Sequence, residues 1–384
     1  MEQLVTSDFK LGIIAGGQLG KMLVLAASNW DVKTFILDMD EHCPASACCA
    51  GFVKGNQLDY DDVLRFGSMV DMITFEVENV NIEALQKLKA DGKKIFPDPD
   101  ALAIIQDKGL QKEFYQINKI PTLQFFLYKN KAEIIAAAET GEISFPFVQK
   151  LRKGGYDGKG VTIIHSKNDF KNLLEGASIV EKLIEIQKEI SVIVARNHKG
   201  EVKCFPVVEM EFNEANMIEK LICPSSLDEK ITEQATEIAI QIISSFNLCG
   251  LLAVEMFVDK KNTVWINEIA PRPHNSGHHT IESLITSQYE QLLRAIFNFS
   301  LGSTQLKMPS VMINLLGEAN YEGPVKYEGI TDCMGIEGVK IHLYGKKITK
   351  PYRKMGHVTI LATSIEEAKN KASIVKLKLK VKSW

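Results

Sequence analysis

The stretch INEIAPRPHNSGHHTIE, residues 266–282, concentrates side chains that could do chemistry. It contains two Asn, two Glu, one Arg and three His. His274 and His278 stand four residues apart, a spacing that places two zinc ligands on one face when the segment is helical. The Pro, Asn, Ser and Gly residues around His274 favour a loop, and no Glu follows it as in an HExxH motif. Arg272, His274 and Asn275 therefore fit a site for an anionic substrate better than a zinc site.

Two acidic residues interrupt apolar strands, one just before this stretch and one within it. GLLAVEMFVD (250–259) and TVWINEIA (263–270) are predicted to pair as antiparallel strands across a short Lys-Lys-Asn turn. A buried carboxylate is costly without a positive partner. Mg²⁺ prefers carboxylate oxygens and commonly bridges them to nucleotide phosphates. Glu255, Asn267 and Glu268 therefore predict a platform for Mg–ATP; the alternative is that the two acids form surface salt bridges.

A glycine-rich loop lies within the segment FPFVQKLRKGGYDGKGVTII, residues 145–164. Its layout is strand, loop, strand, with four glycines among the seven residues 154–160. Glycine lets the backbone approach a ligand closely, at an entropic cost. Tyr156 and Asp157 add a hydrogen-bond donor and a carboxylate. The pattern indicates a lid over nucleotide phosphates, with an ordinary flexible hairpin as the alternative.

A second glycine-rich turn, AGGQLG, joins a short apolar run to a helical pattern within residues 11–28. A helix N-terminus with free backbone N–H groups favours phosphate. Asp38 stands about where a dinucleotide fold places its ribose-binding acid, but Ala15 replaces the first glycine of that fingerprint. Phosphate binding of some kind is favoured; an NAD(P)-dependent oxidoreductase and a turn without a ligand are the alternatives.

The elements that must position these residues alternate along the chain. Strands and helices follow one another at βαβ spacing in residues 1–100, which predicts a parallel α/β layer. A helical segment up to Pro121, further strands in 178–210 and a helix over 228–247 follow. From Met308 onward, strand patterns with glycines between them predict a small third domain. Its alternating tail, IVKLKLKVK, is typical of an edge strand protected by lysines.

The composition is that of a globular protein. The chain has 384 residues, 45% of them hydrophobic and 24% charged, with a net charge of −3, and at roughly 100–200 residues per domain this predicts two or three domains. We expect no nucleic-acid partner, no signal peptide and no membrane span. The seven scattered Cys, with no CxxC pair, indicate reduced thiols and a cytoplasmic protein.

Taken together and in order, these stretches resemble the ATP-grasp ligases, and within them the N5-carboxyaminoimidazole ribonucleotide synthetase family of purine biosynthesis. The matching segments extend from residue 11 to about residue 361, and they are GGQLGKM, TFEVENV, GGYDGKG, VEMFV, NEIAPRPHNSGHHTIE, MINLLGE and YGKKITKPYRKMGHVTI. The resemblance implies a mixed α/β and α+β architecture. An N-terminal parallel α/β pre-ATP-grasp domain (1–105) would precede an ATP-grasp domain (106–307) and a small C-terminal domain (308–384).

The resemblance also implies the reaction. ATP, bicarbonate and 5-aminoimidazole ribonucleotide (AIR) would give ADP, phosphate and N5-carboxyaminoimidazole ribonucleotide. ATP would phosphorylate bicarbonate to carboxyphosphate, and this intermediate, or CO2 released from it, would carboxylate the amine. Two Mg²⁺ ions at Glu255 and Glu268 would neutralise charge on the phosphates. A homodimer is implied as well, whereas NAD, zinc and biotin are not expected.

Site residues follow from the resemblance position by position. The ATP site would comprise Lys108, Lys150, Gly155, Tyr156, Asp157, Gly158, Lys159, Gly160, Glu181, Lys182, Leu183, Ile184, Glu189, Asn267 and Glu268. The AIR site would comprise Gly17, Gln18, Leu19, Glu76, Arg272, Asn275, Lys346 and Arg353. The catalytic group would comprise Tyr156, Asp157, Arg272, His274 and Asn275. Asp157 and His274 are both candidates to receive the proton of the amine, and the sequence does not choose between them.

The chain departs from the family pattern at a few positions. Ala15 replaces a frequent Gly, Lys108 a usual Arg, and Val161 a usual Gln. Met210 and Phe212 stand where Asn and His are common. These changes affect expected nucleotide contacts more than the reaction class. The nearest alternative within the same fold is the formate-dependent glycinamide ribonucleotide transformylase, which PHNSGH and YRKMGH disfavour.

Overall fold

A parallel sheet forms the N-terminal part of the molecule. The computed structural model describes residues 6–155, 160–213 and 217–384. The sheet has the strand order β3-β2-β1-β4-β5 with every pair parallel, and helices alternate with its strands. The strands are β1 (Lys10–Ile14), β2 (Lys33–Asp38), β3 (Gly51–Lys54), β4 (Met72–Phe75) and β5 (Lys94–Ile95). The helices are α1 (Gln18–Ser28), α2 (Tyr60–Ser68), α3 (Ile82–Ala90) and α4 (Pro99–Ile105). This confirms the predicted parallel α/β layer.

Local side-chain caps account for where these helices begin. Asp59, Asn81 and Asp98 each accept a hydrogen bond from a backbone N–H in the first turn of the helix that follows, and Pro99 occupies the first position of α4. The chain order reverses between β1 and β4, so the turns that follow these two strands open at a topological switch point. The glycine turn after β1 and Glu76 after β4 therefore lie at the edge where such folds bind ligands.

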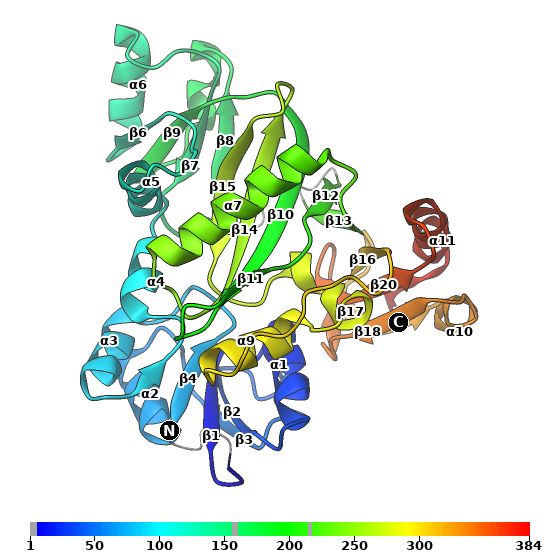
Figure 1. Cartoon of the computed structure of the whole chain (residues 1–384). Coiled ribbons are helices and arrows are strands. Elements are labelled where there is room, and N and C mark those ends of the chain that lie inside the picture. The colour runs from blue at the N-terminus through cyan, green and yellow to red at the C-terminus, as the bar shows by residue number, and fades with distance from the viewer. Residues whose placement is uncertain (1–5, 156–159, 214–216) are drawn as a thin grey trace.

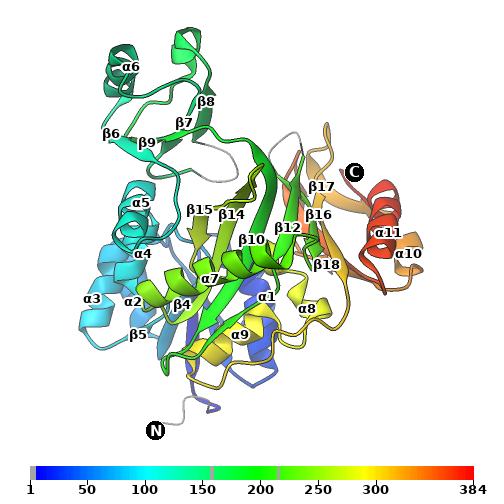
Figure 2. The same ribbon diagram turned by 45° about the horizontal axis from the view of Figure 1, so that its top comes forward.

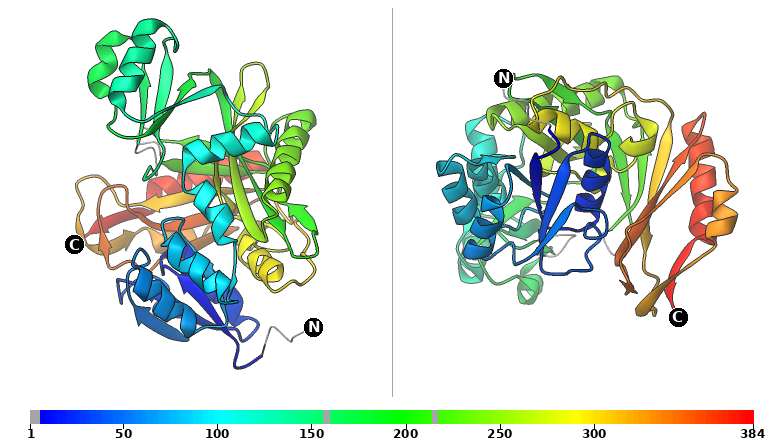
Figure 3. Two further views of the ribbon diagram at one scale, coloured as in Figure 1. Left: turned by 90° about the vertical axis from the view of Figure 1, so that its left-hand side faces the viewer. Right: turned by 90° about the horizontal axis from the view of Figure 1, so that it is seen from below.

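A small antiparallel sheet, with order β6-β9-β7-β8, stands away from the rest of the molecule (Figures 1 and 2). Its elements are β6 (Phe125–Tyr128), α6 (Lys131–Thr140), β7 (Phe147–Leu151), β8 (Val161–Ile164), η1 (Lys167–Asn172) and β9 (Ser178–Lys182), and α5 (Lys108–Ile117) precedes it. β7 and β8 pair antiparallel, as the strand–loop–strand prediction requires. Figure 3 shows this unit at the opposite end of the molecule from the N-terminal sheet.

The largest sheet has the order β15-β14-β10-β12-β13-β16-β20-β18, with β11 paired to β10. Its first part comprises β10 (Ile186–Arg196), β11 (Val202–Cys204), β12 (Val208–Phe212), β13 (Ile218–Cys223), β14 (Gly250–Asp259) and β15 (Val264–Ala270). The associated helical segments are α7 (Glu229–Ser245), η2 (Asn275–Gly277), α8 (Thr280–Ser283) and α9 (Gln288–Ile296). α7 packs on one face of β10 and β14 through buried apolar side chains (Figure 1). The predicted antiparallel pairing of residues 250–259 with 263–270 is confirmed by β14 and β15.

The C-terminal region continues this sheet, because β16 pairs antiparallel with β13. Its elements are β16 (Ser310–Leu316), β17 (Gly323–Glu328), α10 (Ile330–Met334), β18 (Val339–Leu343), β19 (Ile348–Thr349), β20 (Lys354–Leu361), α11 (Ile365–Lys378) and β21 (Lys380–Ser383). Residues 308–384 thus have their own core around α11, but they share a sheet with the segment before them. In the parts of the chain that the structure describes, no helix combines the length and apolar character that a membrane crossing requires.

The prediction for the alternating tail is wrong over most of its length. Residues 374–378 end helix α11, and β21 alone forms a strand, paired with β17. The helix has a competing pattern at helical spacing, since Ala368, Ala372 and Val375 are all buried. Ser364 also caps it by accepting from the Glu367 N–H. The apolar residues of α11 repeat at helical spacing over fourteen residues, and this longer pattern determines the structure rather than the short strand-like alternation at the end of the chain.

Candidate active site

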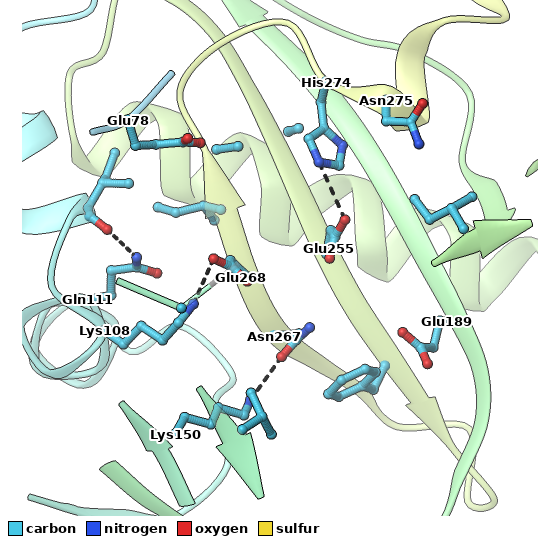
Figure 4. Close-up of a pocket in the computed structure, with 18 of the residues that line it drawn as sticks. Glu78, Lys108, Gln111, Lys150, Glu189, Glu255, Asn267, Glu268, His274 and Asn275 are labelled. Carbon is cyan, nitrogen blue, oxygen red and sulfur yellow. Dashed lines mark hydrogen bonds and ion pairs between the residues drawn. The ribbon is translucent and has the colours of Figure 1, made fainter. Parts of the chain in front are cut away.

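A cleft of about 1160 Å³ lies between the N-terminal sheet, the small antiparallel sheet and the β10–β14–β15 face of the large sheet. Figure 4 shows part of it. Most of the predicted site residues line the cleft: Gln18, Leu19, Glu76, Lys108, Lys150, Gly155, Glu181, Lys182, Leu183, Ile184, Glu189, Glu255, Asn267, Glu268, Arg272, His274 and Asn275. Tyr156, Asp157, Gly158 and Lys159 lie outside the described residues. The structure therefore brings together segments that are up to about 250 residues apart in sequence.

The two acids of the β14–β15 hairpin face each other. Glu255 and Glu268 are register partners, next to an irregularity in the pairing that follows Glu255. Glu189 reaches toward the same space from the neighbouring strand β10 (Figure 4). Burial, together with the negative charges of Glu268 and Glu189, raises the pKa of Glu255 to about 8. Burial also raises the pKa of Glu189. At Glu255, burial and repulsion between the acids therefore outweigh the nearby lysines Lys108 and Lys354.

Lys108 supplies the positive charge nearest to these acids. It is the first residue of α5, and its Nζ lies 2.6 Å from Glu268 Oε1. Asp107 caps this helix by accepting from the Gly109 N–H at 2.8 Å, and it also pairs with the Arg152 side chain at 2.7 and 2.9 Å. The helix start that presents Lys108 is therefore firmly held.

A second acid, Glu181, is fully neutralised by lysines. Its side chain is 1% exposed and lies between Lys150, whose Nζ is 2.8 Å from Oε2, and Lys112, which pairs with Oε1. Burial alone would raise the pKa of Glu181, but the two lysines outweigh it and lower the pKa to about 2. Lys150 also donates to Asn267 Oδ1 at 2.9 Å, which connects this cluster to the β15 platform (Figure 4).

Lys112 was not identified from the sequence. It is 2% exposed, and its Nζ also donates to Thr122 Oγ1 at 2.7 Å. It follows Lys108 by four residues, so the two lysines share one face of α5. This spacing could have identified Lys112 from the sequence, and it explains why both lysines point toward the cleft side of the helix.

The ends of the glycine-rich loop adopt conformations that suit glycine. Gly154 has φ +76° and Gly160 has φ +81°. A Cβ at Gly160 would lie 3.2 Å from the Gly155 Cα, so the two ends of the loop pass close to each other. Both values lie in the left-handed region, where other residues are strained. The glycines here are required by the backbone of the turn.

The segment after β15 places three polar side chains in the cleft. Arg272 pairs with Glu78 of the N-terminal domain at 2.9 Å. His274 Nε2 lies 3.6 Å from Glu255 Oε1. Asn275 is 9% exposed, and neither its Oδ1 nor its Nδ2 has a hydrogen-bond partner among the described residues. A buried amide with open bonding capacity is suited to a polar ligand.

The two histidines that are four residues apart have different partners. His274 Nδ1 lies 2.9 Å from Ser276 Oγ. His278 Nδ1 lies 3.1 Å from the Tyr289 hydroxyl, and its ring stacks on that of His357 with centroids 4.6 Å apart. The intervening residues form a turn of 3₁₀-helix, η2, as the loop composition suggested in place of a long α-helix.

The glycine turn after β1 is filled by acidic side chains from neighbouring strands. Glu76 accepts from the Gly17 N–H at 2.5 Å and from the Gly20 N–H. Burial raises the pKa of Glu76, although these two hydrogen bonds oppose that shift. Asp38 accepts from the Gly16 N–H at 2.7 Å. Because Asp38 is occupied by the turn itself, the structure gives no support to the role in binding a dinucleotide ribose.

The backbone at Ala15 adopts a conformation that suits glycine. Its φ is +69°, in the left-handed region, and its side chain is buried. Of the other departures, Phe212 and Val161 line the cleft, and Met210 on β12 is the register partner of Glu189. Phe212 and Val161 thus give their part of the cleft a more apolar wall than His and Gln would.

The predicted phosphate-binding cations lie in the turns around β19. Burial and the nearby charge of Arg353 lower the pKa of Lys346 to about 8. Lys346 Nζ donates to the backbone carbonyl of Lys354 at 2.9 Å, and Lys354 itself lines the cleft. Lys21, at the start of α1, donates to the carbonyls of Leu343 and Tyr344 at 3.1 and 3.3 Å. The sequence prediction did not include Lys354 or Lys21, because their positions depend on contacts between the two ends of the chain.

Comparison with known proteins matches nearly the whole chain. Residues 9–106 match the profile of the ribonucleotide synthetase preATP-grasp domain, 113–289 that of the ATP-grasp domain, and 310–371 that of the phosphoribosylaminoimidazole carboxylase C-terminal domain. The chain is 34% identical over 370 residues to N5-carboxyaminoimidazole ribonucleotide synthase of Bacillus subtilis, covering 95% of both proteins. Some relatives are longer, and the chain spans 66% and 65% of two of them.

Solved structures show the same architecture. N5-carboxyaminoimidazole ribonucleotide synthetase from Thermotoga maritima superposes with a TM-score of 0.90 at 42% identity, over 98% of this chain and all of that one. The N5-carboxyaminoimidazole synthase of Aspergillus clavatus, solved in complex with ADP and AIR, has a TM-score of 0.87 at 29% identity, over 97% and 98% of the two chains.

Proposed function

The chain belongs to the N5-carboxyaminoimidazole ribonucleotide synthase family of ATP-grasp ligases, and from that premise we propose how its cleft performs the reaction of the family. The protein is an ATP-dependent ligase that carboxylates AIR. The alternatives drawn from the sequence, a glycinamide ribonucleotide transformylase and an NAD(P)-dependent oxidoreductase, are not favoured by these relatives.

The observation that carries the proposal is the pair Glu255 and Glu268 beside Lys108, Lys150 and Asn267 in one cleft. Two facing carboxylates, one with a raised pKa, form a donor set that suits a hard divalent cation. We assign Glu255 and Glu268 as ligands of two Mg²⁺ ions. When bound, these ions would neutralise the phosphate charge that builds up during phosphoryl transfer.

The nucleotide would lie against β9 and the small sheet. Lys150 points into this part of the cleft, with Glu181 fixing its position. We assign the segment from Glu181 to Ile184 to the adenine, Glu189 to the ribose, and Lys108, Lys150 and the loop at 155–160 to the phosphates. Fixed cations beside a site closed to water suit a group that carries several negative charges.

AIR would span the junction between the N-terminal and C-terminal parts. Gly17, Gln18 and Leu19 at the start of α1, together with Lys346 and Arg353, would bind its phosphate, and Glu76 its ribose. The support is the placement of Gln18, Leu19 and Glu76 in the cleft and the closeness of two cations, which suits a dianion. The AIR amine would then approach the carboxyl carbon beside Arg272, His274 and Asn275.

The chemistry would proceed in two steps with bicarbonate as the carbon source. A bicarbonate oxygen attacks the γ-phosphorus of ATP, giving carboxyphosphate and ADP. The AIR amine then forms a bond to the carboxyl carbon, either directly or after release of CO2, phosphate departs, and the amine loses one proton. The residues of the chain orient the reactants and exclude water during these steps. Tyr156 and Asp157, which lie outside the described residues, are proposed to complete this group.

Three further expectations remain proposals: a homodimer, a cytoplasmic location, and a division into residues 1–105, 106–307 and 308–384. The absence of NAD, zinc and biotin from the reaction is likewise a prediction. Size-exclusion chromatography with light scattering would test the dimer directly.

The experiment that tests the function measures phosphate release from Mg–ATP and bicarbonate, with and without AIR. The wild-type chain should release phosphate in an AIR-dependent manner, and Glu268→Gln should not. Stimulation by glycinamide ribonucleotide with formate would keep the fold assignment and overturn the substrate. A lack of ATP turnover under every condition would overturn the ligase assignment itself.

A further inference from the structure

The orientation of His274 is set by two serines that no sequence motif singled out. Ser276 Oγ lies 2.9 Å from His274 Nδ1 and 2.9 Å from Ser191 Oγ. Both serines are almost fully buried. Ser191 lies on β10 as the register partner of Glu255, so this chain of contacts runs beside the proposed metal platform on the same face of the sheet.

The backbone determines which nitrogen of His274 carries the proton. The N–H of Ser276 points at His274 Nδ1 with a separation of 3.3 Å. A backbone N–H can only donate, so Nδ1 must present its lone pair. The Ser276 hydroxyl then donates to Nδ1 as well and accepts from Ser191. A neutral imidazole has one proton, which in this arrangement lies on Nε2.

The loop that carries His274 cannot easily rotate to present the ring differently. The buried Gln288 side chain accepts from the His274 N–H at 2.9 Å and donates to the His274 carbonyl at 2.8 Å. A Cβ at Gly277 would lie 2.3 Å from Ile193 Cδ1 and 2.5 Å from Gln288 Oε1, so the loop packs closely against both side chains. Nε2 is therefore held on the cleft side, facing Glu255 (Figure 4).

We propose that Ser276 and Ser191 are positioning residues that hold His274 in its Nε2–H tautomer. His274 thus donates a hydrogen bond to an oxygen of the carboxyl group being transferred, and it does not take the proton of the amine. This inference rests on the proposed function. As the nitrogen–carbon bond forms and the bond to phosphate breaks, the amine's proton leaves to another acceptor, for which the departing phosphate is available.

The first test reads the tautomer directly and does not depend on turnover. The wild-type protein is labelled with ¹⁵N in its histidine rings, and His274→Gln identifies which signals belong to His274. A long-range ¹H–¹⁵N correlation spectrum should show His274 protonated at Nε2 alone. Protonation at Nδ1 would overturn the proposal, whatever the outcome of the ligase assay.

The second test compares two replacements at His274. The amide nitrogen of Gln can take the place of Nε2 and still donate, whereas that of Asn corresponds to Nδ1. His274→Asn should lower kcat by about 10²–10³-fold, the cost of one lost donor. His274→Gln should keep at least about tenfold more activity than His274→Asn. A residue acting as a base would leave both variants equally inactive, which would overturn the proposal.

The third test examines Ser276 against a matched serine. Ser283 is also buried, and its hydroxyl donates to the His279 carbonyl at 2.8 Å. Ser276→Ala should lower kcat about tenfold with the KM for ATP unchanged, whereas Ser283→Ala should keep wild-type values. Equal kcat values in the two variants would overturn the positioning role. If the wild-type chain itself lacks ligase activity, the proposed function fails, and the tautomer measurement still decides this inference.

Discussion

Two groups of acids in the same cleft differ in how their charge is neutralised. Glu181 lies between Lys112 and Lys150, and its pKa is lowered to about 2. Glu255 faces Glu268 across the β14–β15 hairpin, and its pKa is raised to about 8. Glu181 is buried and Glu255 is partly buried, so burial alone does not explain their opposite shifts, which come from the charges that surround them.

The difference separates acids that maintain the fold from acids that await a ligand. The cluster around Glu181 is complete within the chain and fixes the position of Lys150, for which we propose a role in binding phosphate. The pair at Glu255 and Glu268 has an excess of negative charge that a cation would relieve. A buried acid with a raised pKa inside a cleft is therefore the better marker of a metal site.

The strongest test of this contrast is to replace Glu255 with a neutral residue. Glu255→Gln should reduce kcat by at least about 10³-fold, or about 4 kcal/mol of transition-state stabilisation, because a metal ligand is lost. The unliganded protein should be as stable as the wild type or more stable, since like-charge repulsion is removed. Steady-state kinetics and urea unfolding of the same preparation check both expectations. Activity within tenfold of the wild type would contradict the metal-ligand role.

The cluster of Glu181 with its two lysines should instead lose stability when one of its charges is removed. Lys112→Met leaves Glu181 with one cation and should lower the free energy of unfolding by about 3 kcal/mol. Lys108→Met is the matched control on the same helix, because its partner Glu268 is about half exposed, and it should cost under about 1 kcal/mol. Urea unfolding measures both, and adding Glu181→Gln to Lys112→Met should restore part of the loss. Equal losses in the two lysine variants would remove the distinction between the clusters.

The two acids also predict opposite pH dependences for the unliganded protein. Folded Glu255 retains a proton between about pH 4.5 and pH 8 that the unfolded chain has released, so its contribution to stability falls as the pH rises through that window. Folded Glu181 is ionised down to about pH 2, so its contribution falls as the pH drops from 4.5 toward 2.

Glu255→Gln should therefore flatten the stability profile between pH 5 and pH 8, by about 3–4 kcal/mol relative to the wild type. Urea unfolding at a series of pH values without Mg²⁺ measures this effect. Glu181→Gln is the control, because it should alter the acid side of the profile and leave the slope between pH 5 and pH 8 unchanged. The same slope in wild type and Glu255→Gln would contradict the raised pKa.

Much of the arrangement of Glu255 and Glu268 could be predicted from local sequence. The two apolar runs that form β14 and β15, joined by a short turn, indicated the pairing, and the acid that interrupts each run, Glu255 or Glu268, indicated the proposed platform. The glycine turn after β1 was predictable because it depends on neighbours within a few residues, and the parallel sheet was predictable because strands and helices alternate along residues 1–100.

The cluster of Glu181 with its two lysines, and the serines that contact His274, were harder to predict. Lys112 and Glu181 meet across 69 residues, and Ser191 and Ser276 across 85, so no local pattern records either contact. The pairing of β13 with β16, which joins the C-terminal region to the large sheet, is of the same kind. The tail was mispredicted because its alternation competed with a longer helical period.

Lys150 offers the finest test, because it belongs to both clusters. Its Nζ contacts Glu181 at 2.8 Å and Asn267 at 2.9 Å. Lys150 is more exposed than Lys112, at 13% against 3% of the side chain, so water can replace part of its charge, and Lys150→Met should cost less stability than Lys112→Met, about 1–2 kcal/mol. It should raise the KM for Mg–ATP about tenfold, or about 1.4 kcal/mol, because a phosphate-facing cation is lost. Lys112→Met should show the reverse pattern, with the larger loss of stability and the smaller change in KM. Changes of stability and KM in the same proportion in both variants would mean that Lys112 and Lys150 serve one function. The division between a structural cluster and a ligand-binding cluster would then be wrong.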